Sequence, residues 1–171
     1  MLAEHAIAPT VHAKIHTALA ECFPGFPEGR SYFKQIPHFR YLGWQDGELI
    51  AHMGVEHRVM NQSNNPVQIF GIVDLCVVES ARSQGHAGRL IAELEALGRK
   101  SGIHAVMLFA DDPRLYLGSG YSHTPNTLKW VMLNEHETIG IAERPVAELM
   151  VKTLIEKPWN SSPIDMLGYL F

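Results

Sequence analysis

The stretch VQIFGIVDLCVVESARSQGHAGRLIAELEALGRKSG, residues 67–102, decides the fold. Its first part, residues 67–78, is almost continuously hydrophobic, which is typical of a central strand covered on both faces. A helix is expected from about His86 to Ser101, because leucine and isoleucine recur along one stripe before a glycine stop. A second apolar strand, HAVMLFA at 104–110, follows. Strand, helix and strand form a crossover, so the two strands should be parallel.

The residues before this stretch predict a helix and a hairpin. Thr10 is expected to cap a helix that continues to about Phe23, and Pro24–Pro37 is expected to be a substrate-covering loop with a short helix at 30–35. The strands FRYLGW, 39–44, and ELIAHMGVEHRVM, 48–60, are joined through Asp-Gly, which is typical of a tight hairpin turn.

The residues after it predict a short helix within DDPRLYLGSG, 111–120, and strands that include TLKWVML, 127–133. In the tail, 144–171, a helix or a strand fits the segment PVAELMVKTLI. The segment PWNSSPIDMLGYLF looks irregular, but its apolar side chains indicate that it packs against the rest of the chain. We expect a single domain over residues 1–171, with the tail as an extension that covers a sheet edge or makes a subunit contact, as in a homodimer.

Composition excludes several function classes. The net charge is -4 and no basic stripe is present, so nucleic acid is not expected as a partner. There is no apolar run long enough to span a bilayer and no leader-like start, so no membrane association and a cytoplasmic location are expected. Two cysteines and ten scattered histidines lack ligand spacing, so no metal is expected.

The chemically informative residues lie between the central strand and its helix. A glycine-containing turn followed by a helix start exposes main-chain N–H groups and the positive end of the helix dipole, which suits a pyrophosphate. The Walker A and G-x-G-x-x-G patterns both fail here, and a glycine in an ordinary strand-to-helix turn is the structural alternative. The residues expected to form this anion cradle are Arg82, Ser83, Gln84, Gly85, His86, Ala87, Gly88 and Arg89.

RSQGHA at 82–87 resembles the Arg/Gln-x-x-Gly-x-Gly/Ala signature of the GCN5-related N-acetyltransferase (GNAT) superfamily. LYLGSGY at 115–121 is similar to the aromatic segment after the family's fifth strand, with Leu115 in place of the usual first aromatic residue. The resemblance implies an α/β fold with a mixed central sheet of about six to seven strands, helices on both faces and a splayed parallel pair. Within the superfamily, the pattern looks closest to aminoglycoside 2'-N-acetyltransferases and nodulation acyltransferases.

The resemblance also implies roles for individual residues. Asp74 is the first candidate for the general base, with Asp111, Asp112 and Glu56 as alternatives. Tyr116 is expected to protonate the departing thiolate, unless it only packs on its helix. Leu75, Cys76 and Val77 are expected to bind the cofactor, the N–H of Cys76 or Val77 polarising the thioester carbonyl.

The expected function is transfer of an acetyl group from acetyl-CoA to a primary amine of a small molecule by direct attack, without a metal. Three alternatives stay open: a longer acyl-CoA as the donor, a protein amine as the acceptor, and a non-catalytic acyl-CoA sensor.

Overall fold

The computed structural model describes residues 1–171 and divides into two compact units. The first unit comprises Met1–Glu56 and Ile72–Glu93, and the second unit comprises His57–Gly71 and Leu94–Phe171. Two strands and one helix contribute residues to both units. Whether the chain is one domain, as the sequence suggests, stays a prediction, and each unit is described by itself.

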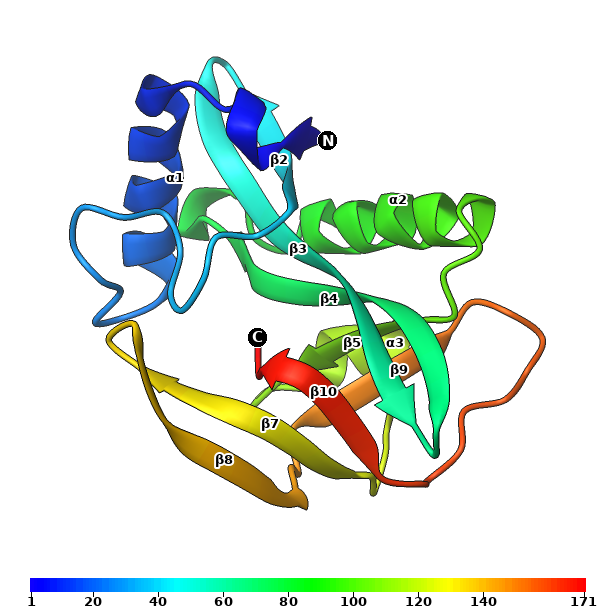
Figure 1. Ribbon diagram of the computed structural model, residues 1–171. Helices are drawn as coiled ribbons and strands as arrows, with labels where there is room; N and C mark the ends of the chain where they lie inside the picture. Colours follow the sequence, from blue (N-terminus) through cyan, green and yellow to red (C-terminus); the bar gives the residue numbers. More distant parts are fainter. The chain divides into compact units, whose positions relative to one another are not determined.

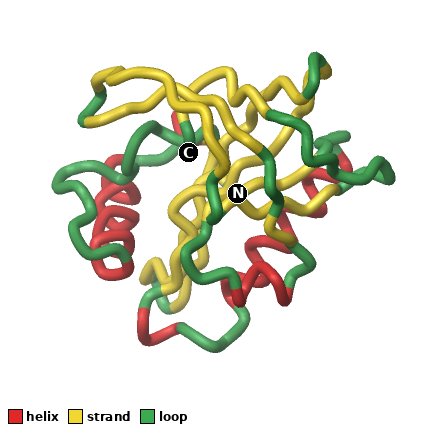
Figure 2. The backbone as a smooth tube through the Cα atoms, turned by 90° about the horizontal axis from the view of Figure 1, so that it is seen from below, coloured by secondary structure: helices red, strands yellow, loops and turns green.

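Strands dominate the backbone (Figure 2), and they form one mixed sheet of ten strands. Their order is β6-β9-β5-β4-β3-β10-β7-β8, with β2 pairing with β3 and β1 pairing with β2. The expected α/β class with a mixed sheet is therefore confirmed, although the strands outnumber the six to seven expected. Two of the additional strands, β1 and β6, are two residues long.

The first unit contains the N-terminal helix and a hairpin (Figure 1). Its elements are β1 (Leu2–Ala3), η1 (Glu4–Ala6), α1 (Pro9–Cys22), β2 (Phe39–Gln45), most of β3 (Glu48–Gln62), the end of β4 (Asn65–Val77), η2 (Glu79–Ala81) and the start of α2 (His86–Lys100). The hairpin turn has both Asp46 and Gly47 at positive φ, as expected for Asp-Gly. Side chains of α1 such as Ile15 and Leu19 pack with Leu49 of β3 and Cys76 of β4 in one apolar core.

Two expectations in this unit were wrong. The first helix begins at Pro9, not after a Thr10 cap, because the fixed φ of proline suits the first helical position. The loop before β2 contains bends but no helix at 30–35. Three side chains outside the loop, those of Arg40, His12 and His16, hold it instead.

The second unit contains the parallel pair β4 and β5, in register at Ile69↔Ala105 and Gly71↔Met107. Its elements are the ends of β3 and α2, the start of β4, β5 (Ala105–Phe109), α3 (Arg114–Gly118), β6 (Ser122–His123), β7 (Thr127–Asn134), β8 (Glu137–Pro145), β9 (Leu149–Thr153) and β10 (Ile164–Tyr169). The parallel pairing confirms the crossover expected from the sequence. The splay expected of the parallel pair stays a prediction.

Helix α2 ends as its sequence predicts. Gly102 has φ 70, its N–H donates to the carbonyl of Arg99, and the N–H of Ile103 donates to the carbonyl of Gly98. This pair of bonds is a Schellman motif, which satisfies carbonyls that a helix end leaves unpaired.

The tail supplies two strands to the second unit. β9 pairs antiparallel with β5, and β10 lies between β3 and β7, parallel to β7 (Figure 1). The segment read as irregular is therefore partly strand.

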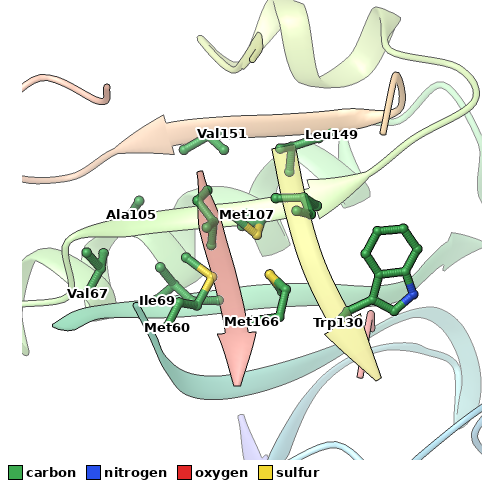
Figure 3. Close-up of a cluster of buried hydrophobic side chains, with 11 residues drawn as sticks. Met60, Val67, Ile69, Ala105, Met107, Trp130, Leu149, Val151 and Met166 are labelled. Carbon is green, nitrogen blue, oxygen red and sulfur yellow. The ribbon is translucent and has the colours of Figure 1, made fainter. Parts of the chain in front are cut away.

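Met60, Ile69, Met107 and Met166 come from four strands and lie together in the core (Figure 3). Asn126 fixes the connection between β9 and β10 by donating to the carbonyls of Asn160 and Ser162.

Gly54 of β3 has no room for a side chain, since an added Cβ would lie 2.6 Å from the Val73 side chain and 3.4 Å from Pro37. We expect Gly54→Ala to lower the free energy of unfolding by about 1–3 kcal/mol, as overpacking does. Gly118→Ala is the control, because a Cβ there meets nothing and alanine favours a helix. Denaturant unfolding measures both, and equal stability of the two variants would contradict the interpretation.

Candidate active site

Asp74 lies inside β4 with a left-handed backbone, at φ 50. A residue other than glycine is uncommon in this region, and one inside a strand interrupts the regular alternation of side chains. The residue is therefore held in an unusual conformation in the middle of the strand that the sequence marks as central. Strained positions of this kind concentrate at functional sites.

The Asp74 carboxyl is half-buried among charged neighbours. Burial raises its pKa above the ordinary value, while the nearby charges of Arg40 and Lys34 and a hydrogen bond from the Phe33 N–H partly oppose this rise. A carboxylate with a raised pKa is a stronger proton acceptor than an exposed one. This position therefore has the properties of a general base.

The backbone of Asp74 is held by a buried polar network from the first unit. His52 Nδ1 lies 2.8 Å from the Asp74 carbonyl oxygen, and Arg40 Nη1 lies 2.9 Å from His52 Nε2. Arg40 is 0% exposed, and Glu4 binds it through both carboxylate oxygens. The N-terminal segment, β2, β3 and β4 thus meet at residue 74.

The loop at 24–37 is tied to the same network. Arg40 donates to the carbonyl and hydroxyl of Ser31, and His12 of α1 also bonds that hydroxyl at 2.9 Å. His16 bonds the carbonyl of Arg30. The loop is therefore fixed next to Asp74 by side chains from two elements.

The anion cradle expected at 82–88 is accessible in the structure. Residues 82–85 are exposed and 86–88 are half-buried, and α2 begins at His86. Ser83 and Gly85 have φ 62 and 78, and alternating backbone conformations of this kind turn neighbouring N–H groups to one side. A Cβ added at Gly85 or Gly88 would meet nothing within 4 Å. The open space in front of both glycines suits an anion that contacts the main chain.

The charged side chains of the cradle brace its backbone. Arg82 Nε donates to the Val77 carbonyl at 3.1 Å, and Arg89 bonds the Gln84 carbonyl and His86 Nδ1. Both guanidinium groups belong to exposed residues, so they also add positive charge beside the exposed N–H groups.

The strand residues before the cradle differ in exposure. Leu75 and Val77 are half-buried, whereas Cys76 belongs to the core of the first unit. Burial, with the neighbouring Cys22 as a further cause, raises the pKa of the Cys76 thiol. The thiol therefore stays protonated, which disfavours it as a nucleophile.

Tyr116 lies on α3 in the second unit. Burial raises its pKa to about 12, so the phenol is protonated at neutral pH and can donate a proton. Its ring makes an edge contact with Tyr121 at 5.9 Å between centroids. Lys152 holds the end of α3 by donating to the Ser119 carbonyl at 2.6 Å, and it pairs with Glu95 at 2.7 Å. Sequence reasoning did not find Lys152 or Glu95.

The alternative bases have different environments. Hydrogen bonds from Arg114 lower the pKa of the exposed Asp112 to about 2, which makes it a weak proton acceptor. Asp111 is exposed. Glu56 is 2% exposed and lies 3.3 Å from His38 Nδ1.

No group of three or more His, Cys, Asp or Glu side chains is placed to hold a metal, and no helix is long and apolar enough to cross a membrane.

Comparison with known protein families gives one match. Residues 6–124 match the family model described as an acetyltransferase (GNAT) domain, which covers most of the chain. The chain belongs to this family. GNAT proteins are acyl-CoA-dependent N-acyltransferases, so the superfamily expected from RSQGHA and LYLGSGY is confirmed. No curated protein matches the chain.

Solved structures share the GNAT fold at low sequence identity. YhbS, a GNAT family N-acetyltransferase from Escherichia coli solved with CoA, is 18% identical with a TM-score of 0.62, covering 94% of this chain and 86% of that chain. An aminoglycoside 6'-N-acetyltransferase solved with coenzyme A is 15% identical with a TM-score of 0.61, covering 88% and 94%. A GCN5-related N-acetyltransferase from Anabaena variabilis is 19% identical with a TM-score of 0.62 and covers 70% of this chain. Our chain spans only 31% of the length of that structure.

His52 makes the stability of this GNAT protein depend on pH. Burial and the charge of Arg40 lower its pKa to about 3, whereas an unfolded histidine titrates near pH 6.5. The unfolded state therefore binds the extra proton first. We expect this group to reduce the free energy of unfolding by up to about 1.4 kcal/mol per pH unit as the pH falls from about 6.5 towards about 3.

Denaturant unfolding across this range tests the expectation. His52→Asn removes the titrating group, so its stability should fall less steeply than that of the wild type. His5→Asn changes an exposed histidine and should keep the wild-type slope. Identical slopes for wild type and His52→Asn would contradict the proposed protonation state.

Proposed function

We propose that this protein transfers an acetyl group from acetyl-CoA to a primary amine of a small molecule. The observation that carries the proposal is the cradle at 82–88, an exposed loop with two left-handed residues that leads into the first turn of α2. Main-chain N–H groups at such a position bind a pyrophosphate, and the family match favours an acyl-CoA as its source.

The residues present fit this co-substrate. Gly85 and Gly88 face open space, so a phosphate oxygen can approach the main chain without meeting a side chain. Arg82 and Arg89 supply the positive charge for the pyrophosphate, and Leu75, Cys76 and Val77 are proposed to contact the remainder of the acyl-CoA. When bound, acetyl-CoA supplies a thioester whose carbonyl carbon accepts a nucleophile.

Asp74 and Tyr116 are proposed to move the two protons of the transfer. An alkylammonium must lose a proton before its nitrogen can form the new C–N bond, and Asp74, with its raised pKa, is suited to accept it directly or through water. Tyr116, kept protonated by burial, is suited to donate a proton to the sulfur as the C–S bond breaks, and the second proton that the nitrogen loses after C–N bond formation restores the phenol. The N–H of Cys76 or Val77 is proposed to stabilise the carbonyl oxygen.

The identity of the amine is a finer proposal. The sequence likeness to aminoglycoside 2'-N-acetyltransferases and nodulation acyltransferases favours a small polar amine or a longer acyl donor, and one structural neighbour is an aminoglycoside 6'-N-acetyltransferase. A protein amine and a non-catalytic sensor stay alternatives. A cytoplasmic location, a homodimer and a single domain over residues 1–171 stay predictions.

We expect Gly85→Ala to weaken acetyl-CoA binding at least about tenfold, because the added methyl group occupies the space in front of the cradle. Gly102→Ala is the matched control, since Gly102 also has positive φ and open surroundings but ends α2. Both substitutions place an alanine at a positive φ, 78 at Gly85 and 70 at Gly102. Isothermal titration calorimetry measures the binding, and equal affinities would contradict the placement of the pyrophosphate.

We expect Asp74→Asn to lower kcat by about 100-fold or more and Tyr116→Phe to lower it less, as removal of a general base or acid does. Asp111→Asn and Asp112→Asn should keep wild-type turnover. The assay is release of free thiol over a panel of small amines, with fatty acyl-CoA as a competing donor. Binding of acetyl-CoA by the wild type without turnover on any amine would instead support the sensor.

A further inference from the structure

We propose that Arg40 and His52 are positioning residues that hold residue 74 in its left-handed conformation and so aim the Asp74 carboxyl. The proposal rests on the proposed function of Asp74 as the base. Neither residue was singled out from the sequence. Both act through hydrogen bonds: Arg40 bonds His52 and the loop, and His52 bonds the Asp74 carbonyl.

Arg40 is a fully satisfied buried cation. A guanidinium has five N–H donors. Its Nε and Nη2 donate to the two oxygens of Glu4 at 2.6 and 2.9 Å, and Nη1 donates to the Ser31 carbonyl at 2.7 Å. The remaining two donors reach the Ser31 hydroxyl at 3.3 Å and His52 Nε2 at 2.9 Å. Because no donor is left over and the side chain is buried, the guanidinium has a single orientation.

This orientation fixes the tautomer of His52. Arg40 can only donate, so His52 Nε2 must carry the lone pair and Nδ1 must carry the hydrogen. Nδ1 then donates to the Asp74 carbonyl oxygen at 2.8 Å, because a carbonyl oxygen can only accept a hydrogen bond. Burial keeps the imidazole neutral, so the donor persists over the working pH range.

The bond to the Asp74 carbonyl acts on the backbone conformation itself. A left-handed conformation costs free energy for any residue with a Cβ, and a hydrogen bond to the carbonyl of that same residue offsets the cost. If the bond is lost, residue 74 is free to relax to an extended conformation. Its Cβ would then point in another direction, and the carboxyl would leave its present neighbours.

The same network also holds the partner of the carboxyl. The Phe33 N–H bonds the Asp74 carboxylate, and Phe33 is two positions from Ser31, which Arg40 binds through both main chain and side chain. Arg40 therefore fixes the Asp74 backbone through His52 and the carboxyl through the loop. The titratable or charged groups that face Asp74 are Arg40, Lys34, His52 and Cys76.

The deciding experiment compares two neutral amide replacements of His52. His52→Asn places an amide N–H near the position of Nδ1 and keeps a donor for the Asp74 carbonyl, whereas His52→Gln places its amide near Nε2 and loses that donor. We expect His52→Gln to lower kcat about 10- to 100-fold with the KM for acetyl-CoA within about twofold, and His52→Asn to recover most of the activity. Calorimetry with acetyl-CoA should give wild-type affinity for both.

A second variant reports on the charge through its pH profile and on the aim of the Asp74 carboxyl through its kcat. Glu4→Gln combined with Arg40→Met removes the buried ion pair as a whole, so no charge is left unpaired. Loss of the Arg40 cation raises the pKa of Asp74, so the acid limb of the kcat/KM pH profile should move to higher pH. Above this limb, the positioning role predicts a lowered kcat, whereas a purely structural role of Arg40 predicts the wild-type kcat.

The outcomes separate this inference from the proposed function. If Asp74→Asn is inactive while His52→Gln keeps wild-type kcat, the positioning role is overturned and the function stands. If Asp74→Asn keeps wild-type turnover, or the wild type does not bind acetyl-CoA, the proposed function fails first. If neither His52 variant folds, the double variant decides, and a wild-type kcat above its acid limb overturns the inference.

Discussion

The buried ion pair between Arg40 and Glu4 is the interaction on which the first unit depends. It joins the N-terminal segment to β2, and through Ser31 and His52 it reaches the loop and β4. A buried guanidinium is tolerated only when its donors are satisfied, so each of these segments must be in place for the others to be stable. The interaction therefore specifies one arrangement of five chain segments, the N-terminal segment, the loop, β2, β3 and β4, rather than adding strength to one contact.

The sequence predicted those elements whose structure depends on interactions between residues close together in the chain. The apolar run at 67–78, the stripe of α2 with Gly102 and the Asp-Gly turn each depend on neighbouring residues, and each was found where expected. The tail was harder. Residues 164–169 alternate poorly between apolar and polar, with Leu167 exposed at φ 49, and become a strand because β3 and β7 lie on either side. Pairing with distant strands leaves no local signature.

The candidate site was predictable in part for the same reason. The cradle was found because its glycine, its helix start and its preceding strand are consecutive. Asp74 was found because it interrupts an apolar run, but its left-handed backbone has no signal in the residue itself. Arg40 and His52 also interrupt apolar strands, in FRYLGW and LIAHMGV, and this is the clue that was available. Their partners are Glu4 and Ser31, which only the folded chain brings near.

The place of β10 has a consequence for the order of folding during synthesis. This strand lies between β3 and β7, yet it is synthesised after both of them. Until then β3 and β7 each have an edge without its partner, and unpaired strand edges invite association with other chains. The nascent protein must therefore keep a gap in its sheet open until residues 164–169 emerge, and only then can β3 and β7 be joined.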